Sequence, residues 1–251
     1  MNLLLIVWGI SFGLALEQPK IEDCDQAYIL RPEKLVETTN CYYSVSESLK
    51  EKTSEEEIAT RKRALEMSAL AASWNAIRGT TLELRTLGIS LGERASNDLM
   101  ASFEKAGSGY YWSAIFQSAK AKDQDGNALI PTHTLKVLPK IKAKLRKTIE
   151  LDETVHGYGA HRVLGIIYTT VPGLVGGDKE LGEKYFKTSL EKAPRFSINP
   201  LYYGKYLVSD DRKDEAREIM KELIEIEPKT FDPDRIQETT LDQKEAEETL
   251  K

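Results

Sequence analysis

The sequence predicts an all-α protein in which antiparallel helix pairs form a helical bundle or solenoid. Apolar residues recur at helical spacing in one stretch after another, and no segment alternates with period two for long enough to require a strand. The chain also repeats itself, because Pro194 and Pro228 close two units of similar pattern 34 residues apart. With 251 residues, it is long enough for one large core.

The amino-acid composition and charge limit which kinds of binding partner are expected. The chain is 41% hydrophobic and 30% charged, which is an ordinary balance for a soluble protein. Its net charge is −5, with 35 Lys and Arg scattered among 40 Asp and Glu. Binding to phosphate backbones requires a concentrated basic face, so nucleic acid is not an expected partner.

Residues 1–15 have the pattern of a secretory signal peptide. The apolar run is short for a membrane span, and Gly13 and Ala15 supply the small residues of a cleavage site before Leu16. An uncleaved anchor and a buried first helix are the alternatives. No Cys follows the run directly, so a lipid-modified amino terminus is not expected, and we predict a periplasmic or secreted protein.

Export would decide the expected state of Cys24 and Cys41. In an oxidising compartment an even pair of cysteines more often forms a disulfide than not. Such a bridge would join the first helix to the second. The alternative is two unpaired thiols in a core.

The main α-helical domain is expected over residues 16–228. Ser54, followed by three glutamates, is an expected N-cap of the helix that ends near Ile77. The helices expected before the repeats span residues 32–45, 54–77, 82–104 and 135–151. A further, aromatic helix is expected to begin at Tyr110 and to end at the turn over 123–127.

The helix at 135–151 carries a basic face around one apolar stripe. This face either contacts a membrane or an acidic partner, or is solvated. Residues 229–251 are acidic and poor in large apolar side chains, so we expect a loosely ordered tail with a marginal helix near its end.

The two repeat units match the period and pattern of tetratricopeptide repeats, most clearly over 158–194 and 197–228. The alternative is two ordinary amphipathic helix pairs. In each unit a glycine would let the paired helix approach closely, with large side chains filling the space around it. The matching positions are Leu164, Gly165, Tyr168, Gly182, Phe186, Ser189 and Pro194 in the first unit, and Tyr203, Gly204, Leu207, Ala216, Met220, Leu223 and Pro228 in the second.

Motifs for catalysis are missing from the sequence, so we expect no enzyme, cofactor or metal. His156 and His161 are five residues apart, which is not the spacing of a metal pair on one helix face. The glycines before Asp178 lack the Gly-Lys-Ser/Thr of a phosphate-binding loop, and Asp178 is better read as a helix cap.

The residues around the first repeat unit resemble the T-component of tripartite ATP-independent periplasmic (TRAP) transporters. The most distinctive part is the long turn from Pro172-Gly173 to Gly176-Gly177-Asp178. The resemblance covers roughly residues 54–228. The other matching residues are His161 to Gly165, Tyr168, Tyr185-Phe186, Leu190, Pro194, Asn199, Tyr202-Tyr203 and Ala216, with Tyr111-Trp112 and Ala114 upstream.

The resemblance implies a bundle of cryptic tetratricopeptide-like repeats in the periplasm. It further implies a partnership with the transporter's soluble solute-binding protein, association into a homotrimer, and a central cavity suited to an apolar ligand. Members of the family are commonly lipoproteins, and this chain departs from them in having no lipidated Cys after its signal.

In a tetratricopeptide unit the first helix lines the concave side. Its register predicts exposed groove positions at Arg162, Ile166, Thr169, Leu201, Lys205 and Val208. A groove of mixed apolar and cationic character suits an acidic peptide segment or a carboxylate ligand. Tyr111 and Trp112 either wall an apolar cavity or pack in the core.

Two functions of different class follow. One is an exported, non-enzymatic adaptor of a solute uptake system. The other is a general protein-interaction scaffold of the cell envelope with no role in transport.

Overall fold

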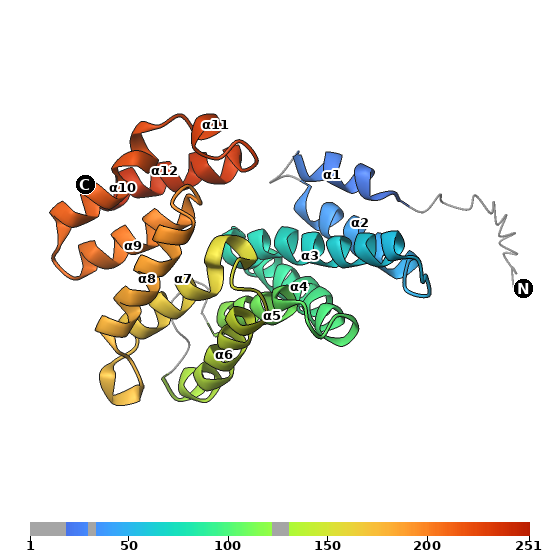
Figure 1. Cartoon of the computed structure of the whole chain (residues 1–251), viewed down its shortest axis with the longest axis horizontal. Coiled ribbons are helices and arrows are strands. Elements are labelled where there is room, and N and C mark those ends of the chain that lie inside the picture. Colours follow the sequence, from blue (N-terminus) through green and yellow to red (C-terminus); the bar gives the residue numbers. More distant parts are fainter. Residues whose placement is uncertain (1–18, 30–33, 122–130) are drawn as a thin grey trace, which may run out of the picture.

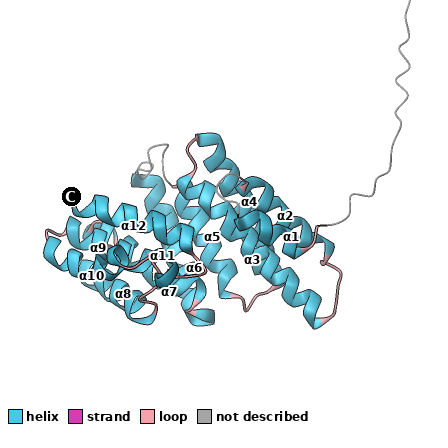
Figure 2. Cartoon of the chain, turned by 90° about the horizontal axis from the view of Figure 1, so that it is seen from above, coloured by secondary structure: helices cyan, strands magenta, loops and turns pink. Residues whose placement is uncertain are grey.

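A computed structural model describes residues 19–29, 34–121 and 131–251, and these are folded as helices joined by short connections (Figures 1 and 2). The predicted all-α class is confirmed. The predicted signal peptide at 1–15 lies outside the described residues. The helices are α1 (Ile21–Ile29), α2 (Leu35–Ser48), α3 (Glu55–Arg78), α4 (Leu82–Ser102), α5 (Gly107–Lys120), α6 (Pro131–Asp152), α7 (Val155–Thr170), α8 (Lys179–Lys192), α9 (Ile198–Ser209), α10 (Lys213–Glu225), α11 (Pro228–Phe231) and α12 (Ile236–Leu250), with a 3₁₀ turn at Gly173–Val175.

Helix α3 begins as its sequence predicts. The hydroxyl of Ser54 accepts a hydrogen bond from the backbone N–H of Glu57 at 3.3 Å and donates one to the Glu57 carboxylate at 2.6 Å. This reciprocal pair satisfies an N–H that the first turn leaves without a helical partner.

The two proline-terminated units fold as helix pairs, α7 with α8 and α9 with α10. A Cβ atom at Gly165 would lie 2.9 Å from the Phe186 ring of α8. One at Gly204 would lie 2.2 Å from Met220 on α10. The glycines therefore let each second helix pack closely against the first, as the repeat spacing predicts.

The first two helices are covalently joined, because Cys24 and Cys41 form a disulfide. Its α1 end is fully buried with Tyr42, whose hydroxyl donates to Asp25 at 2.6 Å. Asp25 also pairs with Arg63 of α3 at 2.9 Å. These contacts hold α1 and α2 on the start of α3.

The basic helix α6 uses several of its cations inside the molecule. Lys142 donates to the Gly176 carbonyl at 2.7 Å, Lys144 to Ser113 at 2.6 Å, and Arg146 to the Tyr168 hydroxyl at 2.6 Å. Part of the basic face is therefore structural.

The carboxyl-terminal segment differs from its prediction as a loosely ordered tail. It forms α11 and α12, and α12 packs on α9 and α10 with Ala246 fully buried. The Gln243 amide donates to the carbonyls of Leu223 and Ile226 at 2.7 and 2.6 Å, at the end of α10. The pair α9 and α10 is the last of the stack and has an apolar side without a further pair to cover it. Helix α12 covers this side although it has few large apolar residues, and the Gln243 hydrogen bonds to the end of α10 help to hold it there.

Side chains of α12 also contact the amino-terminal helices. Arg78 at the end of α3 pairs with Asp242 at 2.9 Å, and Gln237 donates to the Ile29 carbonyl at 3.1 Å. The helices follow an arch whose ends approach one another at α1 and α12 (Figure 1).

Candidate functional site

The predicted groove along the first helices of the two pairs does not form as an exposed surface. Arg162 is 2% exposed and Leu201 is fully buried, so both predictions of exposure are wrong. Helices α7 and α9 pack directly on one another, which buries residues at their shared face. Sequence register alone identifies neither this contact nor the residues it covers.

The other four groove residues are partly buried. Thr169 faces α8, where a Cβ at Gly182 would lie 2.5 Å from its methyl group. Ile166 and Val208 pack against the core of the last pairs. Lys205 pairs with Glu245 of α12 and lies 5.4 Å from the ring centre of Tyr202. An acidic helix does occupy this side of α9, and it is the chain's own α12.

Arg162 instead forms the centre of a polar cluster among α5, α7 and α9. One guanidinium nitrogen, Nη1, donates to the Asn199 amide oxygen at 2.5 Å. The other, Nη2, donates to the Tyr111 hydroxyl at 3.2 Å and to Nδ1 of His156 at 3.1 Å. The structure thus brings together two predicted site residues, Arg162 and Tyr111, with two others.

All three acceptors are neutral groups. Burial and the nearby Arg162 and Arg235 charges lower the pKa of His156 well below its usual value, so its ring accepts from Arg162 instead of carrying a second charge. Burial raises the pKa of Tyr111 and keeps its hydroxyl protonated. The charge of Arg162 is therefore met by dipoles, and burial lowers its own pKa.

A left-handed turn places His156 in this cluster. His156, Gly157 and Tyr158 have φ values of 50°, 58° and 58°, a conformation that costs free energy for residues other than glycine. Asn199 fixes the turn by donating to the Gly157 carbonyl at 3.1 Å, and its amide also donates to carbonyls at the end of α8. Asn199 thus holds the turn and Arg162 at once.

Aromatic rings surround the cluster. Trp112 is 5% exposed, and its ring centre lies 5.1 Å from that of His156. Phe196 contacts His156 edge to face at 5.0 Å. The guanidinium carbons of Arg162 and Arg235 lie 5.6 and 3.8 Å from the Phe196 ring centre, within cation–π range.

No sequence pattern predicts that His156, Phe196, Asn199 and Arg235 belong to one cluster. Asn199 is part of the family resemblance, and the spacing of His156 and His161 bears only on a metal pair. Arg235 lies in the segment predicted to be a loosely ordered tail, so no sequence signal connected it to α7. Only the packing of α12 brings it there.

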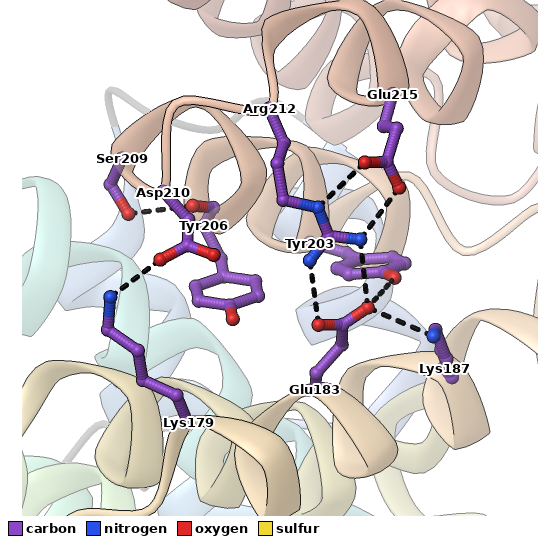
Figure 3. Close-up of polar contacts among 9 residues, drawn as sticks. All are labelled: Lys179, Glu183, Lys187, Tyr203, Tyr206, Ser209, Asp210, Arg212 and Glu215. Atoms are coloured by element: carbon purple, nitrogen blue, oxygen red, sulfur yellow. Dashed lines mark hydrogen bonds and ion pairs between the residues drawn. The ribbon is translucent and has the colours of Figure 1, made fainter.

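A second polar network joins α8 to the connection between α9 and α10 (Figure 3). Arg212 binds both oxygens of Glu183 at 2.8 and 3.1 Å, and Glu183 also accepts from Tyr203 at 2.9 Å and Lys187 at 2.9 Å. Arg212 binds Glu215 as well. Hydrogen bonds from Arg212, above all, lower the pKa of Glu183 to about 2. Every charge drawn there has a partner, so the network stabilises the stacking of the two pairs.

Within the described ranges, no group of three His, Cys, Asp or Glu side chains is placed to hold a metal ion. The side chain of His133 lies outside the described part. Among the described helices, none combines the length and apolar character that a membrane span needs.

Comparison with known proteins identifies the family. No curated protein matches the chain. A family model described as "TRAP transporter T-component" matches residues 36–251, which is most of the chain and includes α12. The chain therefore belongs to the T-component family of TRAP transporters, with an accessory role in transport.

Proposed function

We propose that this chain is an exported, non-enzymatic accessory subunit of a TRAP-type uptake transporter. In the periplasm it docks on the transporter's soluble solute-binding protein, and it binds an apolar or carboxylate ligand. The observation that carries the proposal is the family match over residues 36–251.

Other features agree with this proposal. A disulfide between Cys24 and Cys41 is typical of oxidising compartments, as expected for an exported protein. Close helix contacts recur at Gly165 and Gly204 in two consecutive pairs, which supports describing the pairs as tetratricopeptide-like units. Stacked helix pairs of this type commonly serve as surfaces for protein partners.

Affinity capture from the native cell envelope tests the proposal. The full-length chain carries a carboxyl-terminal tag and is cross-linked in cells before purification, with an unrelated exported helical protein bearing the same tag as control. We expect the solute-binding protein to be enriched over the control. Recovery of envelope proteins without any solute-binding protein would contradict the proposal and favour a general scaffold. Sedimentation of the purified chain tests the homotrimer that the family resemblance implies.

A further inference from the structure

The turn between α7 and α8, residues 171–178, presents an apolar side chain that the described part of the chain leaves uncovered. Leu174 is fully exposed, whereas the other exposed large apolar side chains in the described ranges keep 39–59% of their surface exposed. Val175 beside it is among them, at 39%. The turn forms the lower end of the α7–α8 pair in Figure 1. A single exposed apolar residue is common on protein surfaces, so the shape of the turn decides whether this one has a role.

Backbone hydrogen bonds hold the turn in one shape. The Pro172 carbonyl accepts from the N–H groups of Val175 at 3.0 Å and Gly177 at 3.1 Å, which closes the 3₁₀ turn at the tip. The Asp178 N–H donates to the Tyr168 carbonyl at 2.8 Å and joins the end of the turn to α7. The turn therefore projects its exposed leucine from a fixed backbone.

Two glycines and a lysine of α6 fix the same shape. Gly176 has a φ of 91°, and a Cβ at Gly177 would lie 1.6 Å from the Val171 carbonyl oxygen, so other residues fit neither position without strain. The Lys142 side chain donates to the Gly176 carbonyl at 2.7 Å. Leu174 takes part in none of these contacts and in none of the buried apolar clusters of the described chain. A rigid turn with an unburied leucine has the geometry of a preformed contact point, because little further order is lost on binding.

Two cations of α6 lie beside the turn without a carboxylate partner in the described ranges. Lys142 and Arg146 are one helical turn apart, and they donate to neutral oxygens, the Gly176 carbonyl and the Tyr168 hydroxyl. The charged side chains at the start of α8 pair within the chain or cap their own helix. The surface around Leu174 is therefore apolar at its tip and positive on its α6 side, which complements an apolar pocket with an acidic rim.

The shape of this surface favours a protein partner over a lipid surface. Membrane-bound helices and anchors bury many apolar groups, and even a whole myristoyl chain binds only marginally. The turn offers Leu174 and Val175 alone. A rigid turn with one projecting side chain instead suits a fitted pocket, where preorganisation lowers the cost of association.

We propose that Leu174 enters an apolar pocket on the solute-binding protein, and that carboxylates at the rim of that pocket face Lys142 and Arg146. The turn between α7 and α8 is then the docking surface of the chain. The partner comes from the proposed function, on which this docking surface rests.

Biolayer interferometry with the immobilised full chain and the solute-binding protein of its transporter tests this docking surface. Leu174→Ser should weaken binding at least about tenfold, because a leucine side chain no longer leaves water on association. The melting temperature should be unchanged, since the side chain of Leu174 is fully exposed. Ile58→Ser is the matched control and should bind as wild type does. Ile58 is 42% exposed, and α3 begins on the opposite side of the molecule from the turn (Figure 1).

Lys142→Gln tests the charge beside the turn. An amide can still donate to the Gly176 carbonyl but carries no charge. Association should be about threefold slower at low salt, and the difference from wild type should disappear at high salt. Equal association rates at low salt would show that the pocket has no acidic rim facing Lys142.

The docking surface is wrong if Leu174→Ser binds the solute-binding protein as tightly as Ile58→Ser does. It is also wrong if the leucine is needed instead for self-association on size exclusion, or for sedimentation with vesicles of phosphatidylethanolamine and phosphatidylglycerol. In each of these cases wild type still binds the solute-binding protein, so the proposed function stands. A wild-type chain that binds no solute-binding protein overturns the proposed function, and the docking surface with it.

Discussion

At the scale of single residues, the helix pairs depend on positions where any side chain is too large. Gly165 is such a position, because α8 crosses it with the Phe186 ring and the Gly182 carbonyl at contact distance. Gly173, on the long turn, has no atom within 4 Å of where its Cβ would be. The same substitution at the two glycines therefore separates the effect of close packing from the effect of losing a glycine.

Gly165→Leu should destabilise the fold by about 3 kcal/mol, because the new side chain must displace Phe186 or push α8 away. Gly173→Leu, the matched control, should change the free energy of unfolding by less than about 0.5 kcal/mol. Urea denaturation followed by circular dichroism measures both. Similar losses in the two variants would show that close packing at Gly165 is not what stabilises the pair.

Glu183 should make the stability of the chain depend on pH. Its pKa is lowered from 4.5 to about 2 in the folded protein, so its contribution is present above pH 4.5 and is lost as the pH falls toward 2. Glu183→Gln should cost about 2 kcal/mol at pH 7, and the difference from wild type should shrink over that acid range.

The control for this change is Glu180→Gln on the same helix. The Glu180 side chain is 86% exposed and lies 3.7 Å from Lys184, so its loss should cost little at any pH. A gap between wild type and Glu183→Gln that stays constant from pH 7 to pH 2 would rule out the ion pairs with Arg212 as its cause.

Residues differ in how far the sequence reveals their roles. The glycines that permit close helix contact were predictable, because they recur in phase with large residues and prolines. Arg162 was not, since its burial results from α9 lying against α7. The sequence placed Arg162, Tyr111 and Trp112 among the candidate site residues, but on an exposed groove and a separate cavity.

At the scale of elements, the positions of most helices follow from local sequence signals such as N-caps and apolar stripes. The remaining helices depend on packing against their neighbours. The N-cap at Ser54 and the apolar stripes of α3 and α6 define their helices without tertiary information. Helix α12 has few large apolar residues, so its order depends on contacts with α9 and α10 and with α3, where Arg78 lies 164 residues before Asp242. An acidic composition predicted a loose tail because composition does not report such contacts.

The disulfide should stabilise the amino-terminal elements, because α1 is short and packs chiefly on α2. Replacing both Cys24 and Cys41 by Ser should lower the free energy of unfolding by about 3 kcal/mol, the chain-entropy value for a loop of 17 residues. Denaturation of wild type with and without reductant provides the control. If the double variant and the oxidised wild type unfold at the same urea concentration, α1 gains nothing from the bridge.

At the scale of the whole molecule, the stacked helices form a scaffold that buries the Arg162 cluster among α5, α7 and α9. α12 caps the last pair, brings Arg235 to Phe196, and ties the end of the chain to α3 through Asp242. Helix α12 therefore contributes to the fold, to the covering of the last helix pair, and to the candidate site. The family match extends through it to residue 251.

The most direct test of the account is calorimetric titration of the purified, exported chain with the solute-binding protein of its transporter. We expect saturable binding. The absence of measurable heat, together with separate elution of the two proteins on size exclusion, would contradict the role proposed here.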